Sequence, residues 1–297
     1  MTDTELNNSL IFIEFEEKPM KTQNTFRNRM LVPILVYFII SILSTTGIAL
    51  AQWYQTSAFS DGEYLKYKVK WGIIRLGTIE IFQEKSIFDD IHVFKVKMRA
   101  KSANLPFINV FFINEGNLNP YEPVLQHFTL ISGKGENNIT TYIYDPQSHT
   151  IRMKTIEDEQ TIRSDSLIYS GDLYDALGIF MMIRCLSASG FNITLHNIVE
   201  FKISQTHLNF SGEQEAIKVA AFDDPKKALK FSGKADWVGK SWAGVSGPFK
   251  GWISQDPSAI PLKVQIKIFL GSITLELENF HRESGMENSG SSSLANK

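Results

Sequence analysis

The 297-residue chain has almost no cysteine and no excess of basic charge. Cys185 is the only cysteine, which excludes an internal disulfide and a lipid-modified cysteine near the N-terminus. Its place in an apolar stretch predicts a small buried side chain. Lys and Arg number 30 and Asp and Glu number 32, giving a formal net charge of −2. Because a basic stripe is missing, we do not expect a nucleic-acid partner.

Sequence motifs for metal binding or catalysis are also missing. The six histidines are scattered, and none stands at metal-ligand spacing from another histidine or from a cysteine. Gly239-Lys240-Ser241 resembles the end of a phosphate-binding loop, but Lys234 occupies the place of its first glycine. Asp89-Asp90 and Asp223-Asp224 are typical of turns rather than of acid–base pairs. We therefore predict no metal, no cofactor and no catalytic residue.

A basic segment, an apolar run and small residues follow one another near the N-terminus. Leu31–Leu43 is almost wholly apolar and follows Lys21, Arg27 and Arg29. The triplet Ala49-Leu50-Ala51 then supplies the small residues that a secretory signal peptide carries at its end. We therefore predict that residues 1–51 are a signal peptide, cleaved between Ala51 and Gln52.

An uncleaved membrane anchor is the alternative for this segment. Residues 31–51 just reach the roughly 20 residues that a membrane-spanning helix needs, although the second half is Ser, Thr, Gly and Ala. Cleavage predicts a periplasmic or secreted protein without a stable transmembrane anchor, whereas retention predicts attachment to the inner membrane. Acidic residues at Glu14, Glu16 and Glu17 suit a signal peptide badly, which a translation start at Met20 would explain.

Apolar and polar residues alternate over much of the chain after residue 51. This period of two predicts strands with one buried and one solvated face, which antiparallel sheets typically have. The clearest runs are 64–71, 94–99, 199–204, 262–268 and 273–278, and further strands are expected at 76–84, 108–118, 122–131, 138–144, 150–156, 160–164, 214–222 and 249–254. So many strands must curl to bury their apolar faces and limit their edges. The predicted fold is mainly β, a curved antiparallel sheet that forms an open or partly closed β-barrel.

One helix is expected, over residues 172–189. Asp172 is a good N-cap, and Ser189-Gly190 is a good stop. The segment is apolar almost all round, which predicts a central position buried in the concave side of the sheet. Arg184 interrupts it. A buried guanidinium keeps its charge and needs a carboxylate or carbonyl partner, whereas at the mouth of a groove it could hold an anionic ligand group.

We expect residues 52–282 to form a single β-rich domain. Residues 283–297 are polar and rich in Ser and Gly, which predicts a disordered tail. Residues 226–252 mix glycines, lysines, Trp237 and Trp242. We interpret this segment as a long mobile hairpin connection, and a lid or partner site is the alternative.

Three stretches, taken in order, resemble one known family. They are DGEYLKYKVKWGIIRLGTIEI at 61–81, DLYDALGIFMMIR at 172–184 and GWISQDPSAIPLKVQIKIFLGSITLEL at 251–277. Together they are similar to the exported bacterial domain of unknown function 3108 over most of residues 61–280, while 233–247 fits less well. The resemblance implies an exported envelope protein with a curved antiparallel sheet. It carries over no catalytic residue, because the family has no assigned activity.

Our first functional hypothesis is a non-enzymatic periplasmic module that binds a lipid or another apolar ligand in the concave sheet. The candidate contacts are Trp71 and Trp252 as apolar walls and Arg184 as the holder of an anionic group. The alternative is a structural or assembly partner in the cell envelope, acting through an edge strand or residues 226–252. An enzyme acting on envelope polysaccharide comes third, because it would need carboxylates gathered in one cleft.

Overall fold

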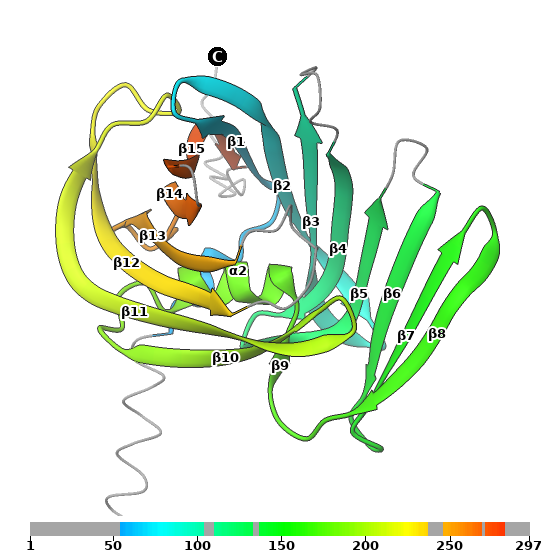
Figure 1. Cartoon of the computed structure of the whole chain (residues 1–297). Coiled ribbons are helices and arrows are strands. Elements are labelled where there is room, and N and C mark those ends of the chain that lie inside the picture. The colour runs from blue at the N-terminus through cyan, green and yellow to red at the C-terminus, as the bar shows by residue number, and fades with distance from the viewer. Residues whose placement is uncertain (1–53, 104–109, 133–136, 237–245, 269–270, 283–297) are drawn as a thin grey trace, which may run out of the picture. The chain divides into compact units, whose positions relative to one another are not determined.

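The structure, a computed structural model, describes residues 54–103, 110–132, 137–236, 246–268 and 271–282 (Figure 1). Every described residue belongs to one compact unit, Trp53–Lys297. The predicted signal peptide, its cleavage site at Ala51 and Gln52, and the predicted tail at 283–297 lie outside the described residues.

The described strands form one 15-stranded sheet. Their bounds are β1 Glu63–Trp71, β2 Ile74–Phe88, β3 Ile91–Ser102, β4 Phe111–Asn119, β5 Glu122–Ser132, β6 Asn138–Asp145, β7 Thr150–Glu157, β8 Gln160–Ile168, β9 Leu173–Tyr174, β10 Asn192–Val199, β11 Lys202–Ile217, β12 Lys226–Asp236, β13 Gly247–Ser254, β14 Pro261–Ile268 and β15 Gly271–Arg282. The order is β8-β7-β6-β5-β4-β3-β2-β1-β15-β14-β13-β12-β11-β10-β9. Every pair is antiparallel except β9 with β10.

The sheet curves until its β9 edge lies against β5, and β6–β8 extend beyond that contact (Figure 1). It does not close, because β8 is one edge and β9 is the other. Inward residues predicted by the alternation are buried, among them Leu65, Leu262 and Leu277. A curved, open antiparallel sheet confirms the predicted fold class.

The helix lies inside the curve, as predicted, but it is shorter than expected. The helix α2 runs over Ala176–Cys185, and the short 3-10 helix η1, Thr56–Ala58, packs against it. Its N-cap is Asp175, whose Oδ1 accepts a hydrogen bond from the backbone N of Gly178 at 2.7 Å. The predicted start at Asp172 was wrong, because residues 173–174 form β9 and pair with β10. Burial of Leu177 and Met181 confirms the expected central position.

A turn without glycine accounts for another difference between the predicted and the observed strands. The run at 199–204 was predicted as one strand, but Glu200 and Phe201 form the tight turn between β10 and β11, with φ of 46° and 65°. Asp89-Asp90, predicted as a turn, connects β2 to β3 with φ of 48° and 61°. The first turn was hidden because neither of its residues is Asn or Gly, the usual residues at positive φ.

The segment 226–252 was predicted as a loop, and this was wrong for most of it. Residues 226–236 form β12, and residues 247–254 form β13, which pairs with β12 from Ala228 to Ala235. Residues 237–245 lie outside the described part. Lys230, Lys234 and Lys250 share one face of the paired strands, and Lys234 and Lys250 are exposed there.

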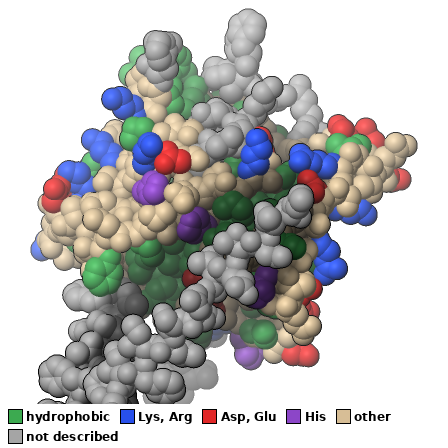
Figure 2. Space-filling view, turned by 60° about the horizontal axis from the view of Figure 1, so that its bottom comes forward, with side chains coloured by type: hydrophobic (Ala, Val, Ile, Leu, Met, Phe, Trp, Pro, Cys, Tyr) green, Lys and Arg blue, Asp and Glu red, His purple; other side chains and the backbone are tan. Residues whose placement is uncertain are grey.

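On the face drawn in Figure 2, hydrophobic side chains gather in a recess, and acidic and basic side chains lie around it. The described part of the chain contains no helix that is long and apolar enough to cross a membrane.

Candidate functional site

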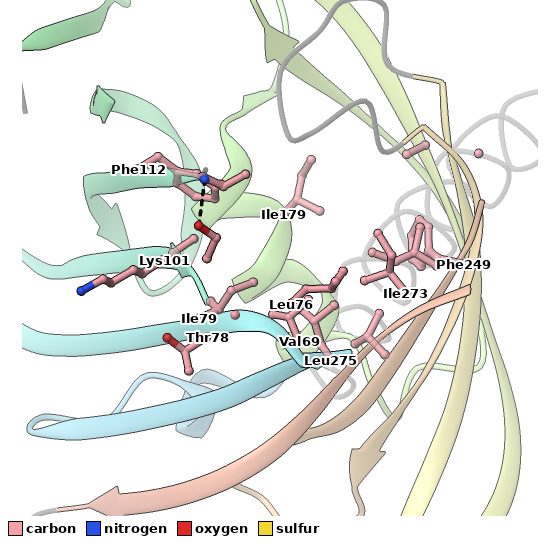
Figure 3. Close-up of a pocket in the computed structure, with 18 of the residues that line it drawn as sticks. Val69, Leu76, Thr78, Ile79, Lys101, Phe112, Ile179, Phe249, Ile273 and Leu275 are labelled. Carbon is pink, nitrogen blue, oxygen red and sulfur yellow. Dashed lines mark hydrogen bonds between the residues drawn. The ribbon is translucent and has the colours of Figure 1, made fainter. Parts of the chain in front are cut away.

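A cavity of about 460 Å³ lies inside the curve of the sheet (Figure 3). Its walls come from β1, β2, β3, β4, β11, β12, β13, β14 and β15, and its floor comes from α2. The lining side chains are mostly aliphatic or aromatic, and none of them is acidic. They are Val69, Leu76, Gly77, Thr78, Ile79, Ala100, Lys101, Ser102, Val110, Phe112, Ile179, Ile183, Thr206, Ala235, Gly247, Phe249, Val264, Ile266, Ile273 and Leu275.

The apolar walls follow from strand alternation. Val264 and Ile266 on β14 lie opposite Leu275 and Ile273 on β15, and all four line the cavity. The residues between them, such as Gln265, point to the other face of the sheet. Because neighbouring strands keep the same phase, the inward positions merge into one continuous apolar surface.

The floor of the cavity comes from one side of α2. Ile179 and Ile183 are one helical turn apart, so they stand on the same face of the helix. Figure 3 shows Ile179 projecting from α2 toward the space that Leu76, Ile273 and Phe249 also face. The helix therefore bounds the depth of the cavity.

The few polar groups of the lining do not make the cavity polar. Ser102 Oγ accepts a hydrogen bond from the backbone N of Val110 at 3.1 Å, and Thr206 Oγ1 donates to Asn197 Oδ1 at 3.0 Å. The side chain of Lys101 extends away from the cavity in Figure 3. A polar ligand would lose hydrogen bonds to water on entry and find few groups in the cavity to replace them. An apolar ligand has no such hydrogen bonds to lose.

Glycine at position 233 lets an aromatic ring cover the wall. A Cβ at Gly233 would lie 2.5 Å from Cζ of Phe249 and 2.4 Å from the carbonyl oxygen of His207. Both distances are far inside van der Waals contact, so no side chain fits there. The ring of Phe249 takes that space and lines the cavity.

Arg184 lies outside the cavity lining, fully buried in a network of charged side chains. Its Nη1 and Nη2 donate to Oε1 and Oε2 of Glu63 at 2.6 and 3.1 Å, and its exposed fraction is 0%. Its Nε and Nη2 also donate to the carbonyl oxygens of Ala259 and Ser258. Arg282 Nη2 donates to Glu63 Oε2 at 2.6 Å. This is the geometry of a structural ion pair, the alternative that the sequence left open.

The network has a further anchor beside the N-terminal segment of the described unit. Gln83 Nε2 donates to Glu63 Oε1 at 2.5 Å and to the carbonyl oxygen of Ala58 at 3.1 Å. Tyr67 donates from its hydroxyl to the carbonyl oxygen of Pro261. Burial raises the pKa of Tyr67 far above its ordinary range, so the hydroxyl stays protonated. The network ties β1, β2, α2 and the segment before β14 together.

The two candidate tryptophans lie in different surroundings, and neither is bonded to Arg184. Trp71 ends β1 and is 40% exposed beside the turn to β2. Trp252 is buried and donates from Nε1 to Glu215 Oε2 at 2.9 Å, with Lys250 Nζ 5.3 Å and Lys263 Nζ 5.7 Å from its ring. Neither lines the cavity. The structure therefore does not bring the three sequence candidates together.

Reactive groups do not gather in the described residues. The Cys185 thiol is buried, and this burial raises its pKa to about 11, which removes the thiolate that a nucleophile needs. Groups of three or more His, Cys, Asp or Glu side chains that could hold a metal are not found among the described residues.

The sequence missed the position of the cavity and the partner of Arg184. The signal for that partner was Glu63, an acidic residue in the same alternation phase as Leu65 and Tyr67, which are buried. The cavity walls at Val264, Ile266, Ile273 and Leu275 were recognised as an inward face. Alternation shows which side chains point inward, but it does not show where the inward side chains leave a cavity between them.

Comparison with known proteins agrees with the resemblance seen in the sequence. The family described as "Protein of unknown function (DUF3108)" matches residues 66–278, and the chain belongs to this family. Curated proteins give no match. A similar solved structure is the "Crystal Structure of Beta-barrel-like Protein of Domain of Unknown Function DUF1849 from Brucella abortus", with 8% identity and a TM-score of 0.49 over 76% of this chain and 99% of that chain.

Proposed function

We propose that this protein binds a lipid or another apolar ligand in the cavity, and that it does so without catalysing a reaction. The observation that carries the proposal is the almost wholly apolar lining of a cavity of about 460 Å³. Ligand sites for small molecules typically measure roughly 300–1,000 Å³ and are mostly apolar. An empty apolar space of this size is costly to maintain, because the lining atoms lose dispersion contacts that a ligand would restore.

Absence of reactive groups in the cavity favours binding over catalysis. The described residues of the lining include no Asp, Glu, His or Cys, so they offer no carboxylate pair for polysaccharide cleavage and no nucleophile–base pair. Lys101 is the one basic residue among the described lining residues, and its side chain points away from the space (Figure 3). A general acid or base would have to come from elsewhere.

We further propose that the protein works in the bacterial cell envelope after export. The support is the sequence of residues 1–51, with its basic segment, apolar run and Ala49-Leu50-Ala51 ending. N-terminal sequencing of the protein recovered from a periplasmic extract tests this. A mature chain that begins at Gln52 is expected, and recovery of the intact N-terminus in the membrane fraction would contradict export with cleavage.

A fluorescent apolar probe, N-phenyl-1-naphthylamine, tests the binding proposal. Ile266→Trp places an indole ring on the cavity wall and narrows the space, whereas Gln265→Trp places the same side chain on the opposite face of β14. A probe beside the added ring loses room and contacts with the wall, so we expect Ile266→Trp to weaken probe binding by roughly tenfold, which corresponds to about 1.4 kcal/mol. Gln265→Trp should bind as the unmodified chain does.

A second candidate function, strand addition by an assembly partner, is favoured by β8. This strand is an edge of the sheet and is exposed along nearly its whole length, with Ile162 and Ile168 open to solvent. A photo-crosslinking residue at Ser164 should then capture one partner in living cells, and a residue at Thr274 in paired β15 should not. Equal capture at both positions would contradict this candidate.

A further inference from the structure

The turn between β1 and β2 presents hydrophobic side chains to solvent. Ile73 is 99% exposed, Ile74 is 47% exposed and Trp71 is 40% exposed. Trp71 pairs with Ile74, so Gly72 and Ile73 form a two-residue turn, and Gly72 has a φ of 57°. Turn geometry requires the glycine, but nothing in the turn requires an isoleucine beside it. We call Trp71, Ile73 and Ile74 the hairpin tip.

Strand pairing places the hairpin tip at one end of the cavity. Val69 and Leu76 line the cavity, and each lies only two residues along its strand from Trp71 and Ile74. On the neighbouring strand, Trp71 is paired with Ile273, which also lines the cavity. The exposed hydrophobic residues and the cavity lining therefore form one continuous apolar path.

Basic residues surround this path on the outer face. Four strands carry a basic residue one position from the end that lies beside the hairpin tip. These residues are Lys70 on β1, Arg75 on β2, Lys101 on β3 and Lys267 on β14. Lys70 pairs with Glu276 and Arg75 pairs with Glu278. Lys101 and Lys267 have no ion pair with any described residue. This edge of β1, β2, β3 and β14 thus carries basic charge without full compensation.

We propose that the hairpin tip docks into the surface of a lipid bilayer that contains anionic lipid, so that the cavity exchanges its apolar ligand directly with the membrane. Tryptophan favours the membrane–water interface, and isoleucine gains free energy by leaving water. The uncompensated lysines would face anionic headgroups when the tip is inserted. The proposal rests on the proposed binding function and names the bilayer as the source of the ligand.

Co-sedimentation with vesicles of phosphatidylcholine containing phosphatidylglycerol tests the docking. Ile73→Asp removes the most exposed tip residue and adds a repelling charge, so we expect vesicle binding to fall by at least roughly tenfold. Because Ile73 is almost fully exposed, this change should not disturb folding. The matched control is Ile168→Asp, since Ile168 is 79% exposed at the far edge of the sheet in β8. It should bind vesicles as the unmodified chain does.

Charge is tested with the variant Lys267→Glu and with vesicles of phosphatidylcholine alone. Each Lys near an anionic surface contributes about fivefold in affinity, so the variant should bind anionic vesicles more weakly. Weak binding to phosphatidylcholine vesicles is also expected. Equal binding by Ile73→Asp and the unmodified chain, or no vesicle binding by the unmodified chain, would overturn the docking proposal.

Probe titration separates this proposal from the binding function. We expect Ile73→Asp to keep the unmodified affinity for N-phenyl-1-naphthylamine, and Ile266→Trp to lose the probe but keep vesicle binding. Probe binding without vesicle binding in the unmodified chain would overturn only the docking proposal. Vesicle binding without probe binding would overturn only the proposed function.

Discussion

At the scale of single residues, the ion pair of Arg184 and Glu63 shows how a charge is kept inside this fold. Both side chains are almost completely buried, and the carboxylate accepts hydrogen bonds from Arg184, Arg282 and Gln83. Removing two charges from water is costly, and these bonds offset that cost. If one partner were lost, the other would remain buried without compensation.

The first residue-scale prediction concerns this pair. Glu63→Gln should lower the free energy of unfolding by about 3–5 kcal/mol, because Arg184 would face a neutral amide. The control is Glu278→Gln, which breaks the bidentate pair with Arg75 at 2.8 Å. That pair is 48% and 27% exposed, so its loss should cost about 0–1 kcal/mol. Urea unfolding gives both values, and equal costs would contradict the argument.

Asp175 gives the second residue-scale prediction. Burial raises its pKa from an ordinary 3.8 to about 6, although the bond from the Gly178 backbone N opposes the shift. A raised pKa stabilises the folded protein fully below the unfolded value, and that stability is lost as pH rises through the folded value. The free energy of unfolding should therefore fall between about pH 4 and pH 6, by about 1–3 kcal/mol.

Asp175→Asn keeps an N-cap but carries no charge, so this fall with pH should disappear. The control is Asp172→Asn, since Asp172 is exposed just outside the helix. Thermal unfolding measured from pH 4 to pH 7.5 compares the two. An unchanged pH dependence in Asp175→Asn would contradict a buried carboxyl with a raised pKa.

At the scale of elements, the turn between β10 and β11 links strands that are distant in the sheet order. The ring of Phe201 lies 3.7 Å from Cζ of Arg163 on β8, and its centroid lies 5.7 Å from that of Tyr142 on β6. Phe201 also holds a positive φ, which a bulky side chain rarely adopts. The turn therefore secures β6–β8 against the rest of the curve at the cost of local strain.

Phe201→Ala should loosen this connection. Loss of the aromatic and cation–π contacts is expected to cost about 1–2 kcal/mol. Amide hydrogen exchange should become faster in β6–β8, while probe binding stays unchanged because Phe201 does not line the cavity. Phe191→Ala, at a partly exposed phenylalanine just before β10, is the control. Faster exchange throughout the described unit, or unchanged exchange in β6–β8, would contradict a local role for Phe201.

Element prediction from the sequence succeeded where alternation was strict and failed where tertiary pairing decided. β1, β14 and β15 follow from their period of two, and α2 follows from its apolar composition. Leu173-Tyr174 was assigned to the helix because nothing local shows its pairing with β10. The turn at Glu200-Phe201 was missed because its strain is offset by contacts with Arg163 and Tyr142, which are distant in sequence.

At the scale of the described unit, the curved sheet and α2 together divide the interior into two regions. Around Glu63 and Arg184 the interior is filled by bonded side chains, whereas the cavity occupies the end near the β1–β2 turn. The network joins β1, β2, β15 and α2, so it holds the helix in place as the floor of the cavity. The shape of the cavity thus depends on the Glu63–Arg184 ion pair, although neither residue lines the cavity.

The sequence predicted this architecture but not the cavity in it. A run of inward Val, Ile and Leu residues is equally compatible with a filled core and with a lined space. Which one results depends on the curvature of the strands and on how far the side chains of Phe249 and Ile183 reach into the interior. Both are properties of the three-dimensional structure. For the same reason Trp252, an aromatic residue in an apolar strand, was expected on the wall, although it lies outside the lining.

Native mass spectrometry of the protein purified from its own cells without detergent tests the central claim most directly. We predict a discrete apolar adduct at one copy per chain, which organic extraction removes and Ile266→Trp prevents. A bare chain that acquires no adduct after incubation with total lipid extract, with Ile266→Trp indistinguishable from it, would contradict a ligand-binding cavity.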